Sequence, residues 1–157
     1  MVQLKLITPI AAPAERCFDL SRNIDLHLAS TNWTGEQAIT GVTSGLIGNN
    51  QEVTWRARVL GIPVKHTSRI TAYEFPRYFQ DSMVKGAFHS YCHDHYFETQ
   101  DGGTLMRDEI GFAAPCGLLG RAVERLWLEQ YLRKLLERRN AYIKQVAEGE
   151  DWKQYVS

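Results

Sequence analysis

Hydrophobic and polar residues alternate along much of the chain, in short segments that turn residues separate. Alternation with a period of two is typical of strands that bury one face. Pro9 is expected to end the first strand, and the connections between the later segments are too short for parallel crossovers, so we expect one antiparallel sheet. The predicted strands are 3–8, 36–40, 51–60, 64–74, 78–85, 88–99 and 104–114.

Three helices are predicted, two from residues that start helices and the third from the spacing of its apolar residues. Pro13 opens a short helix over residues 14–20, and Asn23 or Asp25 caps a second one over 24–30. After Pro115 the apolar residues recur every three or four positions, which predicts a helix from about 117 to 148, about 48 Å long at about 1.5 Å per residue. The tail from about residue 150 looks loosely held, and residues 1–157 are expected to form a single domain.

The turn at Asp101-Gly102 predicts how two strands pair. A tight hairpin there places Gln100 opposite Gly103, and therefore His95 opposite Asp108 and His93 opposite Ile110. Side chains directly across an antiparallel pair lie about 4.5–5.5 Å apart at Cβ, so a contact between His95 and Asp108 is feasible.

Charge and composition exclude several classes of protein. The 157 residues carry 18 Lys and Arg and 18 Asp and Glu, so the net charge of zero argues against a nucleic-acid partner. The sequence has no run of about 18 apolar residues of the kind that spans a membrane, and residues 1–7 lack the long apolar stretch of a signal peptide. Three well-separated cysteines without a CxxC motif are typical of reduced thiols. We expect a cytoplasmic protein, either a monomer or a homodimer.

The order of elements and four motifs resemble a known superfamily. The motifs are the stretches 76–88, 93–98, 102–108 and 115–120, and the resemblance covers about residues 2 to 148. Together they resemble the START and polyketide-cyclase (SRPBCC) superfamily, in its small bacterial ligand-binding or cyclase/dehydrase-like subgroup. This implies an α+β helix-grip fold: a curved seven-stranded antiparallel sheet wrapped around a long C-terminal helix, with two short helices between strands 1 and 2. The resemblance implies binding of a small hydrophobic molecule, and it brings no single catalytic motif.

Alternation also predicts which side chains face the long helix and line a cavity there. In strand 64–74 the inward set is expected to be His66, Ser68, Ile70 and Ala72. The charged residues of the helix, Arg121, Arg125, Arg133, Lys134, Arg138 and Arg139, are expected to form a solvated face. The predicted ligand-binding residues are Trp55, Phe79, Asp81, Met83, Tyr91, Phe97, Met106, Ile110, Phe112, Tyr131 and Leu135.

Inward-facing acids need partners, which leaves three interpretations of the polar cluster. In the first, Asp108 orients His95 for general acid–base chemistry on a carbonyl compound, with His93 as a third catalytic residue. In the second, the same groups form a buried network without chemistry. In the third, His93 and His95 bind a metal together with Asp81 or Asp108, at a spacing that permits a site without being diagnostic. We expect no metal and no cofactor, because the spaced motifs of zinc sites are absent.

Three functions remain open from the sequence. The leading hypothesis is binding of a small hydrophobic molecule, such as a lipid, a polyketide or an aromatic compound, in the cavity. The alternative is an enzyme of the polyketide cyclase or dehydratase type that uses the His–Asp pair. A third is an interaction module whose core is filled and whose surface binds a partner.

Overall fold

A curved antiparallel sheet forms most of the molecule. The computed structural model of the chain describes residues 1–59, 61–114, 122 and 127–156. Within them the sheet has seven strands in the order β1-β7-β6-β5-β4-β3-β2, so consecutive strands are neighbours except that β1 closes against β7. The strands are β1 (Val2–Ile10), β2 (Gln37–Gly41), β3 (Glu52–Val59), β4 (Ile62–Glu74), β5 (Tyr78–Lys85), β6 (Ser90–Gln100) and β7 (Gly103–Ala113).

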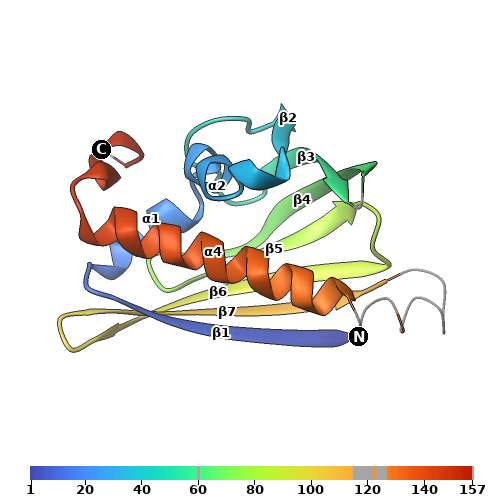
Figure 1. Ribbon diagram of the computed structural model, residues 1–157. Coiled ribbons are helices and arrows are strands. Elements are labelled where there is room, and N and C mark those ends of the chain that lie inside the picture. Colours follow the sequence, from blue (N-terminus) through green and yellow to red (C-terminus); the bar gives the residue numbers. More distant parts are fainter. Residues whose placement is uncertain (60, 115–121, 123–126, 157) are drawn as a thin grey trace.

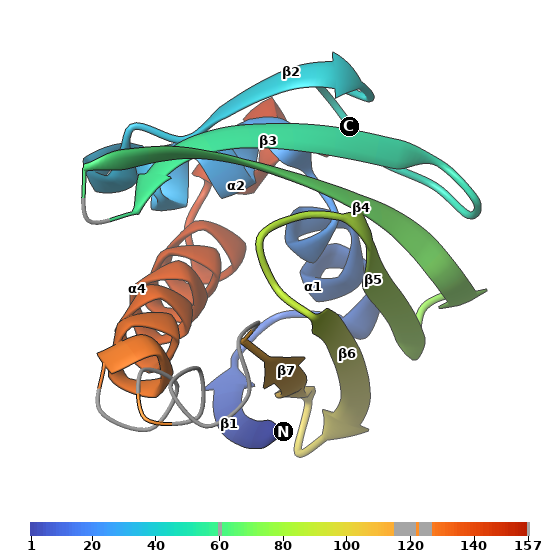
Figure 2. The same ribbon diagram turned by 90° about the vertical axis from the view of Figure 1, so that its right-hand side faces the viewer.

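The helices lie on the concave side of this sheet. The helix α4 crosses the sheet from end to end (Figure 1), and the curled strands partly enclose α1 and α4 (Figure 2). This confirms the predicted α+β helix-grip architecture. The helical elements are α1 (Ala14–Ser21), α2 (Ile24–Ser30), the 3-10 turns η1 (Asn32–Thr34) and η3 (Asp151–Gln154), and α4 (Glu129–Glu148).

Local chemistry fixes the ends of the helices. Pro13, in an extended conformation, immediately precedes α1. Of the two candidate caps for α2, Asn23 is the cap, because its Oδ1 accepts a hydrogen bond from the Leu26 amide at 2.9 Å. The helix α4 ends before Gly149 as predicted. The predicted start of that helix near residue 117 lies outside the described residues.

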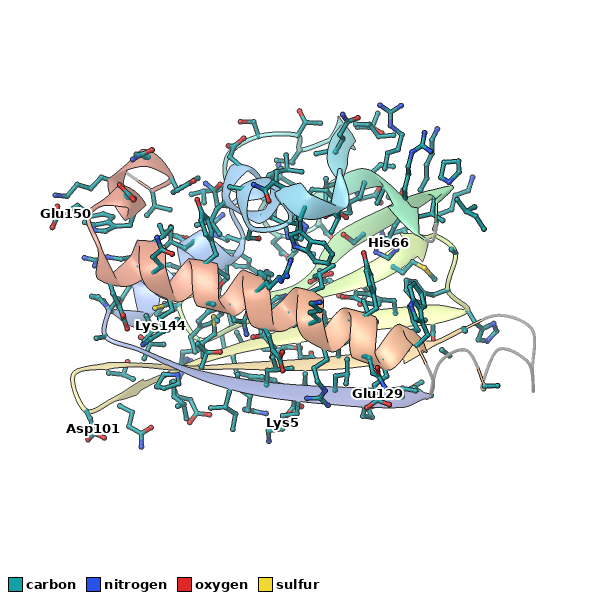
Figure 3. The ribbon with its side chains drawn as sticks, in the orientation of Figure 1. Lys5, His66, Asp101, Glu129, Lys144 and Glu150 are labelled. Carbon is teal, nitrogen blue, oxygen red and sulfur yellow. The ribbon has the colours of Figure 1, made fainter. Side chains whose placement is uncertain are left out.

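The β6–β7 hairpin has the predicted register. Gln100 pairs with Gly103, His93 with Ile110, and His95 with Asp108. Asp101 and Gly102, at φ values of 50° and 77°, supply the left-handed backbone that a two-residue turn requires. Asp101 marks the tip of this hairpin, at the end of the molecule where the C-terminal half of α4 lies (Figure 3).

Two strand predictions were wrong in detail. Pro9 does not end the first strand, which continues to Ile10; β1 is an edge strand, where a missing amide donor is tolerated. In β4 the register shifts by one residue between Ile70 and Ala72. As a result Tyr73, rather than Ala72, packs on the apolar core, and a bulge of this kind is not visible in the alternation itself.

The tail, which was expected to be loosely held, contacts the apolar core and the first two helices. The side chains of Trp152 and Tyr155 pack against the apolar core. The Arg16 guanidinium lies 4.1 Å from the centre of the Trp152 ring, and the Asn23 amide donates to the carbonyl oxygen of Tyr155 at 2.9 Å. These contacts tie the end of the chain to α1 and α2.

The buried apolar residues form two clusters. The α1 core surrounds the Phe18 ring, which lies 5.1–5.3 Å from the rings of Tyr73, Phe75, Phe79 and Phe97. The β1 core consists of Leu4, Ile110, Phe112, Leu128, Leu132 and Leu136. Of the helices that the structure describes, none is long and apolar enough to cross a lipid bilayer.

Candidate functional site

A cavity of about 450 Å³ lies between the sheet and α4. Its size falls in the range of small-molecule sites. Its outer end reaches the surface near Ile62, which is 65% exposed, and near the exposed residues Lys65 and Ala87. His66 of β4 also lines it, on the sheet near the first half of α4 (Figure 3). Eight of the predicted site residues line this cavity: Trp55, Phe79, Asp81, Tyr91, His93, His95, Tyr131 and Leu135.

The other predicted residues face inward but do not line the cavity. Phe97 and Met106 lie closer to the Asp101 turn, where α1 covers the sheet, and belong to the α1 core. Ile110 and Phe112 are covered by α4 in the β1 core. The Met83 sulfur packs over Gly86 beside His66. Asp108 is fully buried below His93 and His95.

Several cavity residues escaped the sequence analysis because they lie outside the strands. His27 of α2 stacks near Trp55, with ring centres 4.5 Å apart, and its Nε2 lies 2.8 Å from Oε2 of Glu36. Burial alone raises the pKa of the Glu36 carboxyl, but His27 and the Thr31 hydroxyl outweigh it and lower the pKa overall. No pattern in the sequence links His27 with Glu36, which lies nine positions away, so the contact becomes visible only in the fold.

Asp108 is the centre of a buried polar group that we call the His–Asp cluster, made of Asp81, His93, His95 and Asp108. The Nε2 atom of His93 lies 2.8 Å from Oδ1 of Asp108. The Asn140 amide of α4 donates to the other carboxylate oxygen at 2.7 Å. The carboxylate is therefore held from both the sheet and the helix.

The predicted dyad between Asp108 and His95 has a different geometry. His95 Nδ1 lies 3.1 Å from Asp108 Oδ1, yet this buried nitrogen has no hydrogen-bond partner among the described residues. Its hydrogen bond is made by Nε2, 2.9 Å from Oδ2 of Asp81, and its ring stacks on Phe79 at 4.1 Å. Asp108 thus hydrogen-bonds His93, the residue diagonal to it in the hairpin, rather than the one directly opposite.

Arg139 was expected on a solvated face of the helix but is only 4% exposed. Its guanidinium lies 3.5 Å from Asp108 Oδ1 and donates to the Ser21 carbonyl oxygen at 2.9 Å. The expectation was wrong because α4 is covered on this side by α1, so that Arg139 is buried against a carboxylate that compensates its charge.

The pKa values of the cluster diverge. Burial works to raise the pKa of Asp108, but the hydrogen bond with His93 and the close approach of both His93 and His95 hold it well below its usual range. At Asp81 burial also works to raise the pKa, but the hydrogen bond with His95 and the charge interaction with His93 lower it to about 2. Burial, and then the neighbouring His95, lower the pKa of His93 to about 4. At neutral pH the cluster therefore has two carboxylates beside a neutral His93.

This arrangement can exchange protons with a bound molecule and can offer ligands to a cation. Asp81 is its most open carboxylate, with 22% of its side chain exposed, against 0% for Asp108. One ligand atom from each of Asp81, His93 and His95 lies within 4.8 Å of the others. Asp108 contacts the far side of both imidazoles.

Comparison with known proteins identifies the fold. Neither a family model nor a curated protein matches the chain in sequence. The Zhui aromatase/cyclase from Streptomyces sp. R1128 matches in structure with a TM-score of 0.73 at 16% identity, over 94% of this chain and 93% of that one. The protein TTHA0849 from Thermus thermophilus matches with a TM-score of 0.71 at 14% identity, over 93% and 99%. A START superfamily protein from Mycobacterium smegmatis matches with a TM-score of 0.65 at 10% identity, over 92% and 98%. The chain therefore has the helix-grip fold that START-superfamily proteins and this aromatase/cyclase share.

Proposed function

We propose that the protein binds a small, mainly apolar molecule carrying a hydroxyl or carbonyl group in the cavity between the sheet and α4. The observation that carries the proposal is the cavity of about 450 Å³ itself, which lies between the sheet and α4. A lipid, a polyketide and an aromatic compound all belong to this class.

The walls of the cavity support an apolar occupant. Aromatic rings line it from three directions: Trp55 from β3, Phe79 from β5 and Tyr131 from α4. Burial of apolar area is the main favourable contribution to binding in such pockets, and rings add offset or edge contacts with a planar ligand.

The polar groups of the wall support a ligand with one oxygen function. Asp81 and His93 reach the cavity from the His–Asp cluster. Tyr91 lines it as well, and burial raises the pKa of its phenol well above the usual value, so that it remains a hydrogen-bond donor. A few placed donors and acceptors in an apolar pocket orient a ligand and supply its specificity.

Fluorescence titration tests the proposal, because Trp55 and Trp127 both line the cavity. We expect saturable changes in tryptophan emission with at least one member of a panel made of a long-chain alcohol, a flavone and a polycyclic phenol. The variant Ala57→Phe places a ring in the cavity and should weaken that binding by tenfold or more.

Arg58→Phe is the matched control, since Arg58 is the exposed next residue of the same strand. It adds the same ring on the opposite face and should leave the dissociation constant within twofold. Absence of saturable binding to the whole panel, or equal affinities of the Ala57→Phe variant and the wild type, would contradict the proposal.

A second candidate function is an acid–base reaction of the cyclase or dehydratase type. The specific observation in its favour is that His93, His95 and Asp81 of a proton-exchanging cluster lie in the cavity wall. A β-hydroxy ketone incubated with the protein should lose water faster than in buffer. His95→Gln should abolish that acceleration while the fluorescence titration still reports binding. Binding without any acceleration would leave only the first function.

A further inference from the structure

We propose that Asp81, His93 and His95 form a binding site for a divalent transition-metal ion in the wall of the cavity. The site goes beyond the proposed binding of an organic molecule and does not depend on it. Asp81 lies on β5, directly paired with His93 of β6, and His95 follows two residues later on the same face. Two rigid neighbouring strands therefore position all three side chains.

The distances fit ligands that share one ion. Oδ2 of Asp81 lies 2.9 Å from Nε2 of His95 and 3.8 Å from Nδ1 of His93. Zinc binds imidazole nitrogen and carboxylate oxygen at about 2.0–2.2 Å, so two ligands of one ion lie about 3.0–3.8 Å apart for angles of about 90–130°. The ligand atoms of His93 and His95 lie within 4.8 Å of each other, so the two rings come closer together when the three atoms surround one ion.

Asp108 holds the imidazole of His93 in the form that binds a metal. Its carboxylate accepts from Nε2–H of His93 at 2.8 Å, which leaves the Nδ1 lone pair directed towards Asp81. A histidine that ligates a metal almost always donates its other N–H to a carboxylate or carbonyl in this way. Asn140 and Arg139 in turn hold Asp108, so this outer layer is itself fixed.

His95 has a conflict that a metal ion resolves. A neutral imidazole carries one N–H, yet both nitrogens of His95 face carboxylate oxygens: Nε2 faces Asp81 at 2.9 Å and Nδ1 faces Asp108 at 3.1 Å. With the proton on Nε2, the buried Nδ1 has no hydrogen-bond partner and lies beside an anion. With a cation between Nε2 and Asp81, the proton is carried by Nδ1, and a small rotation of the ring is enough for it to reach the Asp108 oxygen.

The charges point the same way. Asp81 and Asp108 supply two negative charges, and Arg139, the only Lys or Arg in an ion pair with either carboxylate among the described residues, supplies one positive charge. With neutral imidazoles, one buried negative charge remains, which is costly in the interior. The cluster therefore attracts a cation, and a divalent ion at Asp81 changes the summed charge from −1 to +1, on the side of the cluster that is open to the cavity.

The donor set selects the class of metal. Two imidazole nitrogens and one carboxylate oxygen suit Zn²⁺, Fe²⁺ and Co²⁺ better than Mg²⁺ or Ca²⁺, which prefer oxygen ligands. Asp81, His93 and His95 all line the cavity, so the remaining coordination positions face it and are open to water or to a ligand oxygen.

Titration of the chelator-treated, full-length protein with Zn²⁺ alone tests the site by calorimetry. We expect one-to-one binding, weakened tenfold or more by Asp81→Asn. Asp108→Asn, which removes only the outer contact, should weaken it about 10–100-fold. Asp94→Asn and His89→Ala are controls: Asp94 bonds Tyr78 and Gln80 on the opposite face of β6, and His89 is exposed just before that strand. Both controls should bind as the wild type does.

Cobalt substitution of the wild type keeps the test valid if a variant fails to fold. Proton NMR of the Co²⁺-loaded protein should show two strongly shifted, exchangeable imidazole N–H signals, one for each ligating histidine. Absence of saturable Zn²⁺ binding, equal affinity in Asp81→Asn, or a Co²⁺ spectrum without shifted imidazole signals would each overturn the proposal.

Discussion

Protonation of His93 should make the folded protein sensitive to mild acid. His93 is 4% exposed, and its pKa falls from the usual 6.5 to about 4 on folding. Between these two pH values the unfolded chain therefore binds a proton at His93 and the folded protein does not. As a result the free energy of unfolding decreases as the pH falls through this window. A lowering of this size, at about 1.4 kcal/mol for each pKa unit, corresponds to about 3 kcal/mol. That is a large part of the about 5–15 kcal/mol that stabilises an ordinary domain.

Urea unfolding at several pH values between 7 and 4, with a chelator present, measures this loss. The variant His93→Gln keeps an amide donor that can face Asp108 and removes the titrating ring, so most of the pH dependence should disappear. A smaller part should remain from His66, because burial also lowers its pKa. The carboxylates contribute below this window, since the pKa of Asp81 is lowered to about 2. A wild type that loses less than about 1 kcal/mol between pH 7 and 4, or a His93→Gln variant with the same slope, would refute the reasoning.

Three substitutions test the fold itself. Phe18→Ala removes a fully buried ring from the α1 core and should lower the free energy of unfolding by about 3–5 kcal/mol in urea titrations; a loss below about 1 kcal/mol would show that the ring is not packed as described. Asn23→Ala removes the cap of α2 and the bond to the tail, and should cost about 1–2 kcal/mol by the same assay. Gly41→Ala should lower the melting temperature far more than Gly45→Ala, because both have positive φ but only at Gly41 would a Cβ lie 2.1 Å from the Glu52 carbonyl oxygen.

Local sequence signals were enough for the existence and order of the strands and for the register of the β6–β7 hairpin. The Asp101-Gly102 turn predicted the β6–β7 pairing because a two-residue hairpin allows only one register. The structure has that register. The period of the apolar residues likewise separated strands from helices. These signals act over a few residues, which is why they are readable without a structure.

The site depended on contacts that local signals do not contain. Strand alternation predicted that His93 and His95 lie on the same face. It did not predict which carboxylate oxygen each ring would contact. The burial of Arg139 depends on how α4 is rotated over the sheet and on the position of α1, both set by packing between distant segments. The bulge before Ala72, which turns Tyr73 inward, depends on the pairing of β4 with β5.

The division of the interior into the α1 core and the β1 core has a consequence for how the molecule opens. The first half of α4 contributes Leu132 and Leu136 to the β1 core, next to Leu128, which precedes the helix, and the second half contributes Ile143 and Val146 to the larger α1 core. Regions with fewer buried contacts open with smaller free energies than the whole domain. Amide hydrogens of residues 129–136 should therefore exchange with deuterium faster than those of 140–147. Because the first half of α4 also lines the cavity, opening of this one end of the helix would widen the mouth near Ile62 while the rest of the chain stays folded.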